Sequence, residues 1–457
     1  MNDTARVTAQ LCEVDRAHYL HPFTDHAELY ASSGPLIIER AKGSHVWDTD
    51  GNRYLDGLAG LCCVNIGYGR EELGTAAARQ IGELAYFNSF FKCTHRRAIE
   101  LSERITALAP AGFNRIFYCN SGSESNDTAI RMVRHYWTLM GQPQRQTIIG
   151  RWFGYHGSTV AAAAMGGIPP IHEQAGTAPG FAHIQPPYQF GLGRDQTPEA
   201  FGITAARWLE EKILELGPDN VAAFIAEPLQ GAGGGKMPPA TYWPEIQRIC
   251  TKYGILLVVD EVITGFGRTG AWFGCETYAI RSADLICFAK GVTSGYVPLG
   301  GVLVGDRVAD TLIERGGEFH HGFTYSGHPV AAAVALANID IMEREALVAR
   351  ARDDIGPYFG KALQRLAGHR LVGEVRNVAL FGAVELVADR NTLEPLTPVG
   401  EIGEKLRPHA LRHGIIIRPI LETVIVSPPL IITHAEVDFL VERFGLALDD
   451  YARELGL

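Results

Sequence analysis

Two charged residues stand where buried strands are expected to end. Lys290 follows the hydrophobic run 285–289, and Asp260 follows the run 255–259. A buried ion without a partner is unfavourable, so each of these side chains needs one. A pyridoxal 5'-phosphate (PLP) ring supplies both partners, because its aldehyde forms an imine with a lysine and its protonated ring nitrogen pairs with a carboxylate. The pair therefore predicts PLP as the cofactor, with Lys290 and Asp260 as catalytic residues.

A phosphate site is indicated by the segment Ser121-Gly122-Ser123, which follows the strand-like run 115–119 and opens a helical pattern. Glycine, serine hydroxyls and free amides at a helix N-terminus form a cradle for phosphate. Ser121 and Glu124 also match an ordinary capping box. The two interpretations are compatible, because a cap and an anion site use the same end of the helix.

Further candidates follow other strand-like runs. Tyr155 and His156 lie between two glycines after the run 147–149, where a flat aromatic ring can lie against a planar cofactor. Glu227 ends another run, at the sheet edge where open α/β sheets bind ligands, and Val262 can pack on the ring face opposite Tyr155. Each candidate has an ordinary alternative: a turn tyrosine, a solvated or capping carboxylate, or a surface lysine.

Two other motifs suggest chemistry that the sequence does not support. The loop Gly231–Lys236 resembles a nucleotide loop, but Gln230 and Met237 replace the glycine and the Ser/Thr which that motif requires. We interpret it as a flexible turn near the substrate. His320 and His321 have no neighbouring cysteine or cluster of carboxylates, so no metal site is expected.

Composition limits the class of protein. The chain has 457 residues, 46% hydrophobic and 20% charged, with a net charge of −10. This charge argues against binding to nucleic acid or to a membrane surface, and no apolar run is long enough to span a bilayer. The eight cysteines form no C-x-x-C pair, and the N-terminus has no signal-peptide pattern. We therefore expect a cytoplasmic protein with reduced thiols.

The pattern of elements predicts an α/β fold. Apolar runs alternate with helical patterns at 123–140, 204–216 and 241–253, which favours a mostly parallel sheet covered on both faces. The strand-like runs are 115–119, 147–149, 221–226, 255–259, 285–288 and 302–304. A smaller α+β domain is expected from both chain ends, with a hairpin at 48–51, a helix at 328–350, strands around 371–387 and 414–427, and a helix at 434–455. The predicted domain bounds are 1–65 and 330–457 for the small domain and 66–329 for the large one.

These segments together resemble a class III (ω-amino acid type) PLP-dependent aminotransferase of fold type I. The motifs that carry the resemblance occur in family order: residues 120–126, 154–157, 260–270 and 288–291. The resemblance extends over nearly the whole chain and is strongest to amine:pyruvate transaminases, or ω-transaminases.

The resemblance implies roles for the cofactor site. Lys290 is the Schiff-base lysine and proton carrier, Asp260 pairs with the pyridinium nitrogen, and Tyr155 and Val262 enclose the ring. Thr324 is expected to reach the phosphate of a neighbouring subunit, so the assembly is a homodimer or a dimer of dimers with a shared active site. The implied cofactor-binding residues are Ser121, Gly122, Ser123, Tyr155, His156, Glu227, Asp260, Val262, Lys290 and Thr324.

The resemblance also implies a substrate site. Arg418 matches a mobile arginine that binds the substrate carboxylate, and Phe23 and Phe90 are expected as apolar walls beside Tyr155. Relatives commonly carry tryptophan where this chain has Cys62. A small residue there predicts a wider pocket that accepts bulkier amines.

The predicted reaction transfers an amino group from an amine or ω-amino acid to pyruvate, giving alanine by a ping-pong mechanism. The alternatives on the same scaffold are an aminomutase, a racemase, a decarboxylase, or a biosynthetic aminotransferase for ornithine-like or diamine substrates. A catalytically silent PLP-holding or nucleotide-binding protein is a further alternative, against which the intact Lys290, Asp260 and Tyr155 argue.

Overall fold

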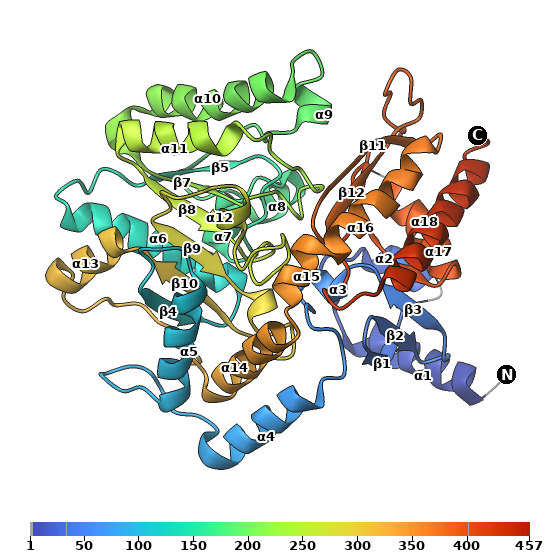
Figure 1. Ribbon diagram of the computed structural model, residues 1–457, viewed down its shortest axis with the longest axis horizontal. Coiled ribbons are helices and arrows are strands. Elements are labelled where there is room, and N and C mark those ends of the chain that lie inside the picture. Colours follow the sequence, from blue (N-terminus) through green and yellow to red (C-terminus); the bar gives the residue numbers. More distant parts are fainter. Residues whose placement is uncertain (1–2, 33, 401) are drawn as a thin grey trace.

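A seven-stranded sheet forms the centre of the molecule in the computed structural model, which describes residues 3–32, 34–400 and 402–457. Its strand order is β4-β10-β9-β8-β7-β5-β6. The strands are β4 Arg115–Cys119, β5 Thr147–Arg151, β6 Phe181–Ile184, β7 Val221–Ala226, β8 Leu256–Asp260, β9 Leu285–Phe288 and β10 Gly300–Val304. Figure 1 shows this sheet between layers of helices.

The direction of the strands determines where the site residues meet. β5, β6, β7, β8 and β9 are parallel neighbours, and β10 is antiparallel to both β9 and β4. β4 therefore runs in the same direction as β9. The carboxyl ends of all strands except β10 thus lie along one edge of the sheet, the edge at which open α/β sheets place ligands.

Both faces of the sheet are buried, as the continuous apolar runs predict. In β8, Leu257 and Val259 pack into a cluster with helices α5, α10, α11 and α14, whereas Val258 packs into a cluster with α6 and α13. This alternation follows from the two-residue period of a strand. Each buried aliphatic side chain contributes about 1.5–3 kcal/mol relative to exposure. The helices are α5 Arg96–Leu108, α6 Gly122–Leu139, α10 Pro198–Leu216, α11 Tyr242–Tyr253, α13 Asp306–Arg315 and α14 Pro329–Arg344.

Two four-stranded sheets are built from the ends of the chain. The first has the order β1-β2-β3-β13, in which Ile415 of β13 pairs in parallel with Leu55 of β3, so the N- and C-terminal segments form one sheet. The second is antiparallel, with the order β11-β12-β15-β14. Their strands are β1 Ile38–Lys42, β2 His45–Asp48, β3 Arg53–Asp56, β11 Val372–Val378, β12 Phe381–Leu386, β13 Ile415–Ile416, β14 Arg418–Ile420 and β15 Thr423–Val426.

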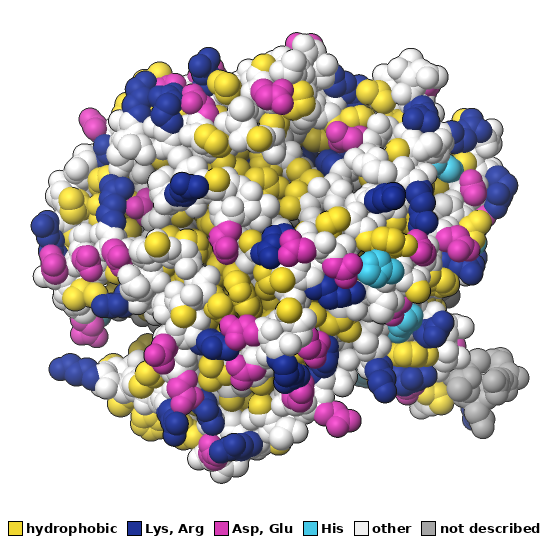
Figure 2. Space-filling model, viewed as in Figure 1, with side chains coloured by type: hydrophobic (Ala, Val, Ile, Leu, Met, Phe, Trp, Pro, Cys, Tyr) yellow, Lys and Arg dark blue, Asp and Glu magenta, His cyan; other side chains and the backbone are white. Residues whose placement is uncertain are grey.

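The remaining helices surround these sheets, and Figure 2 shows hydrophobic side chains along the middle of the molecule between its two parts. In the described ranges no helix is long and apolar enough to cross a membrane. The helices are α1 Asp3–His18, α2 His26–Ala31, α3 Ala59–Cys62, α4 Glu71–Leu84, α7 Val160–Met165, α8 Pro169–Ala175, α9 Gln189–Leu192, α12 Gly274–Thr277, α15 Leu347–Asp353, α16 Ile355–Leu363, α17 Ile402–Arg412 and α18 His434–Glu454, with short 3₁₀ turns at Pro218–Asn220, Lys290–Val292 and Gln364–Gly368.

The α/β fold, its mostly parallel sheet and the smaller sheet region from both chain ends are confirmed. The helix predicted over 328–350 is wrong in detail, because the chain breaks between α14 and α15 at Ala346, which has φ +50°. β6 was not predicted. The domain bounds stay a prediction.

Candidate active site

Loops from neighbouring strands bring the predicted site residues to one edge of the sheet. Asp260 ends β8, and Lys290 follows β9, the adjacent parallel strand. The loop with Tyr155 follows β5, and Glu227 follows β7. The N-terminus of α6, at Gly122, follows β4. Residues far apart in sequence therefore share one edge, as the strand directions require.

Asp260 is held by three hydrogen bonds. Asp260 is buried, with only 3% of its surface exposed. Oδ2 lies 2.7 Å from His156 Nδ1 and accepts from Asn126 Nδ2 at 2.9 Å, while Oδ1 accepts from the Val262 amide at 3.0 Å. These bonds compensate for burial of a carboxylate and fix its orientation.

Asn126 also belongs to this site, although it is not among the residues predicted from the sequence. Its amide nitrogen also donates to the His156 carbonyl at 2.7 Å, so it ties α6 to both Asp260 and the Tyr155 loop. Its position in the repeat of apolar residues along α6 could have identified it from the sequence. Asn126 falls on the stripe of Ile130, Val133 and Trp137, where a polar side chain among apolar ones needs a specific partner.

Lys290 adopts a backbone conformation that is rare for a residue with a side chain. Its φ is +44°, in the left-handed region. Asn338 Nδ2 donates to the carbonyls of Gly291 and Val292 at 3.0 Å each and so holds this turn. Within the described part of the chain, no hydrogen bond or ion pair is found for the half-buried Lys290 ammonium. Strain and an unpaired lysine together are typical of a functional position.

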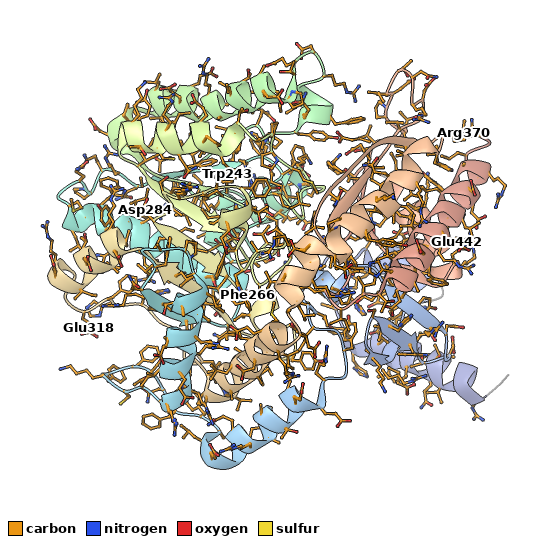
Figure 3. All side chains as sticks on the ribbon, in the orientation of Figure 1. Trp243, Phe266, Asp284, Glu318, Arg370 and Glu442 are labelled. Carbon is orange, nitrogen blue, oxygen red and sulfur yellow. The ribbon has the colours of Figure 1, made fainter. Side chains whose placement is uncertain are left out.

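Phe266 packs against the turn that follows Lys290. Its carbonyl accepts from Asn65 Nδ2 at 2.7 Å, and its ring packs on Phe288 with centroids 5.9 Å apart. A Cβ on Gly291 would lie 3.0 Å from Phe266 Cβ, so only glycine allows this close packing. Figure 3 labels Phe266 in the interior, between the central sheet and the elements of the chain ends.

The N-terminus of α6 is capped by side chains and tied to a neighbouring loop. Ser121 Oγ accepts from the Glu124 amide at 3.2 Å, and Glu124 Oε2 accepts from the Asn120 amide at 2.7 Å, so the capping interpretation holds in a form shifted by one residue. Ser123 Oγ accepts from the Ser158 amide at 3.1 Å, which ties the helix to the loop after Tyr155.

Gly122 provides close approach to Val262. A Cβ at Gly122 would lie 2.9 Å from both methyl groups of Val262. A β-branched side chain has little rotamer freedom to move away. Gly122 therefore packs directly against Val262, and any side chain at position 122 would force Val262 to move.

Glu227 supports the Tyr155 loop from within the core. Glu227 is 4% exposed; Oε2 accepts from the Gly231 amide at 2.8 Å, and Oε1 accepts weakly from the Tyr155 amide at 3.4 Å. Burial raises the pKa of the Glu227 carboxyl, and Asp260 acts in the same direction, while His156 and Arg151 oppose the rise. Glu227 thus acts on the site through the backbone of Tyr155.

The predicted substrate residues occupy different environments. Phe23 is 77% exposed, with its ring centroid 6.3 Å from that of Tyr155, and Phe90 is half-buried against Gly322. Thr324 is exposed, and its carbonyl accepts from the Tyr86 hydroxyl at 2.7 Å.

Cys62 and Arg418 complete the set. Cys62 is 5% exposed and packs in an apolar cluster that includes Leu229 and Ile425, so an open pocket beside it stays a prediction. Arg418 lies half-buried on β14, opposite Ile425. No hydrogen bond or ion pair of its side chain is found among the residues that the structure describes.

The residues at this edge fit PLP in type and arrangement. A buried carboxylate is positioned at one strand end and an unpaired lysine at the next, as the ring nitrogen and the aldehyde require. The N-terminus of the 18-residue helix α6 offers amides and hydroxyls for a phosphate, and Gly122 at its start packs closely against Val262. The fold and this site define a PLP-dependent transferase.

Comparison with known proteins identifies the family. Residues 29–448 match the model of the class III aminotransferases, and the chain belongs to this family. It is 51% identical over 440 residues to the putrescine–pyruvate aminotransferase of Pseudomonas aeruginosa, covering 96% of each chain. Enzymes of this class use PLP.

Solved structures of ω-transaminases have the same fold as this chain. A thermostable (S)-enantioselective ω-transaminase from Thermomicrobium roseum is 46% identical, with a TM-score of 0.94 and coverage of 97% of this chain and 98% of that chain. An ω-transaminase from Pseudomonas jessenii, solved in complex with PMP, a derivative of PLP, is 41% identical, with a TM-score of 0.95 and coverage of 98% of this chain and 99% of that chain.

Proposed function

We propose that this enzyme binds PLP and transfers an amino group from an amine or ω-amino acid to pyruvate, giving alanine. The observation that carries the proposal is the unpaired Lys290 beside the hydrogen-bonded Asp260 on adjacent strand ends. The name of the Pseudomonas aeruginosa relative supports a diamine donor and pyruvate as acceptor. The mutase, racemase, decarboxylase and biosynthetic alternatives have less support from the relatives.

The residues divide the work by position. When bound, PLP supplies an aldehyde that links to amines and a ring that withdraws electrons from the substrate carbon. Asp260, held by His156 and Asn126, would pair with the ring nitrogen and favour its protonated form. Lys290 Nζ would accept and return the substrate proton, a role that contributes about 10²–10⁴-fold to the rate.

The same residues also position the cofactor. Tyr155 and Val262 would hold the ring of the bound cofactor. Gly122 and Ser123, at the start of α6, bind the phosphate through backbone and hydroxyl donors. With both ends of the cofactor held, these residues would orient the substrate carbon toward Lys290, and such positioning favours proton transfer.

Arg418 is proposed to bind the carboxylate of pyruvate. A charge-assisted hydrogen bond contributes about 1.5–3 kcal/mol, so Arg418→Gln is expected to raise the KM for pyruvate about 10–100-fold. The kcat/KM for an amine without a carboxylate should stay within about twofold of wild type, since that half-reaction binds no carboxylate. Steady-state kinetics with each substrate varied would measure this. Arg248→Gln, which removes an exposed arginine paired with Glu245, serves as control. An unchanged pyruvate KM together with a lower melting temperature would instead assign Arg418 a purely structural role.

Cys62 is proposed to determine the size of the amine that is accepted. Cys62→Trp should lower kcat/KM for 1-phenylethylamine about tenfold more than for putrescine, since the larger ring takes up pocket volume. Cys62→Ser, which preserves size, is the matched control. Because a tryptophan in this apolar cluster also strains the packing, thermal melting should accompany the kinetics. Equal losses for both amines would contradict the role in size selection.

A homodimer is proposed as the smallest active assembly. Phe87 and Phe91 are 48% and 86% exposed and Tyr325 is 58% exposed, next to the Tyr86–Thr324 hydrogen bond. Large exposed aromatic side chains near one another are typical of an interface. Thr324 would then lie where it can reach the phosphate bound to a second chain.

The cellular location of the enzyme is proposed to be the cytoplasm.

The reaction is tested by its stoichiometry. Purified enzyme with PLP, putrescine and pyruvate is expected to form one alanine for each carbonyl product, as followed by chromatography. β-Alanine, taurine and 1-phenylethylamine, tested in turn, would identify the donor class. Without pyruvate, product formation should stop after one carbonyl product per active site. Sustained turnover without any keto acid would favour the mutase, racemase or decarboxylase alternatives.

A further inference from the structure

The glycine-rich loop Gly231–Gly235 is a closed structure at the boundary between the central sheet and β12. Gln230 and Lys236 close it through two backbone hydrogen bonds of 3.0 Å each. Gly235 has φ +57°, and a Cβ there would lie 2.6 Å from Ala383 Cβ on β12. The loop is therefore seated tightly on the sheet formed by the C-terminal part of the chain.

Lys236 ends this loop with a buried cation. Lys236 is 6% exposed, and its ammonium donates to the Gly233 carbonyl. The same ammonium lies 4.9 Å from the ring centroids of Phe153 and of Tyr188. A desolvated cation between two aromatic faces is attracted to both rings. Lys236 therefore connects the loop to the segment that carries Tyr155.

Arg376 on β11 holds the other side of the loop. Its Nε donates to the Gly235 carbonyl at 2.8 Å, and one terminal nitrogen donates to the Gly234 carbonyl at 2.9 Å. The same nitrogen donates to Glu385 Oε2 at 2.7 Å, and that oxygen also accepts from Thr423 Oγ1 at 2.9 Å. The antiparallel sheet is thereby fastened to the loop.

The loop leads directly to the active site. The Gly231 amide donates to Glu227 Oε2 at 2.8 Å, and Glu227 Oε1 accepts from the Tyr155 amide at 3.4 Å. Gln230 Nε2 donates to the Trp152 carbonyl at 3.0 Å, which fixes the start of the Tyr155 loop. A movement of the glycine-rich loop would therefore move the ring that is expected to cover the cofactor.

We propose that Lys236 is a positioning residue: with Arg376 it latches the glycine-rich loop between the two parts of the molecule and so holds Glu227 and Tyr155 in place for the cofactor. This inference deepens the proposed function and rests on its PLP site. Neither Lys236 nor Arg376 touches the reacting atoms, so each acts through the loop.

The latch should respond to pH. Burial lowers the pKa of Lys236 to about 8, with Arg376 acting in the same direction and Glu385, Glu227 and Glu422 opposing it. The charged and titratable groups around the ammonium are Arg376, Glu385, Glu422, Glu227 and Tyr188, and Glu374 is hydrogen-bonded to Arg376. As pH rises from 7 to 9, Lys236 loses its charge and with it the attraction to the rings and to Glu385. The loop should loosen over the same range.

The experiment compares amide hydrogen exchange and PLP binding in wild type, Lys236→Met and Lys252→Met. Lys252 is an exposed lysine paired with Glu210, so Lys252→Met controls for loss of a lysine. For Lys236→Met at pH 7, we expect faster exchange in peptides covering 229–237 and PLP affinity weaker by about tenfold, the size of one lost interaction of this kind. Exchange in peptides from 198–216 should not change.

A pH series on the wild-type enzyme keeps the test independent of whether a variant folds. After correction for intrinsic exchange, protection of 229–237 should fall between pH 7 and 9, and this transition should be absent in Lys236→Arg, whose charge does not titrate there. Protection and PLP affinity that match wild type in Lys236→Met would overturn the proposal, as would a wild-type loop insensitive to pH. Because exchange of the apoenzyme requires neither amine nor pyruvate, failure of the latch is distinguishable from failure of the proposed reaction.

Discussion

Replacing Lys290 with alanine is expected to lower the rate of alanine formation by more than about 10⁴-fold, because the variant loses the attachment of the cofactor and the proton carrier together. The fold should persist, since no hydrogen bond or ion pair of the Lys290 ammonium is found among the described residues. The measurement is pyruvate-dependent alanine formation at saturating PLP, with circular dichroism as a check on folding.

Lys252→Ala is the matched control, because Lys252 is exposed and lies on α11, away from the strand ends. It should keep the wild-type rate. A Lys290→Ala enzyme that turned over at a rate near that of wild type would show that another group carries the proton and would remove the basis of the assignment.

The second large effect is expected for Asp260→Asn, which should lower kcat about 10²–10³-fold, as loss of a preorganised electrostatic partner typically does. Asparagine has nearly the same size, but it cannot keep the ring nitrogen protonated. It can still accept from Asn126 or Val262, so the change in structure should be small. We therefore expect kcat to fall by a larger factor than the affinity for PLP.

Asp284→Asn provides the comparison for a buried carboxylate away from the site. Asp284 precedes β9, at the end of that strand opposite Lys290, and is labelled apart from Phe266 in Figure 3. Its Oδ2 accepts from the Leu257 amide at 2.9 Å, so this variant should affect stability more than kcat. Equal losses of kcat in the two variants would indicate that Asp260 acts only as a structural residue.

Much of the fold follows from local sequence. Continuous apolar runs identified strands such as β7 and β8, because strands buried on both faces need hydrophobic residues at every position. The direction of β10 was not predictable, since an apolar run carries no sign of which neighbour it pairs with. β6 was missed because its half-buried residues Phe181–His183 do not form such a run.

The site was predicted less completely than the fold. Residues at strand ends, such as Asp260 and Lys290, were identifiable because a charge directly after an apolar run needs an explanation. The contacts of Asn126 and the burial of Cys62 depend on elements distant in sequence. Lys236 was interpreted as part of a flexible turn, whereas the structure buries it between aromatic rings of two other segments. Pairings of this kind are set by the tertiary fold.

The visible spectrum of the purified PLP-loaded protein reports directly on whether Lys290 holds the cofactor and whether the cofactor passes an amino group to pyruvate. Putrescine, β-alanine, taurine and 1-phenylethylamine would be added in turn, followed by pyruvate. We expect at least one amine to remove the yellow absorbance and pyruvate to restore it, without any further addition. A protein that stays colourless with added PLP would contradict the assignment of Lys290, and a yellow protein that none of the amines bleaches would contradict the proposed reaction.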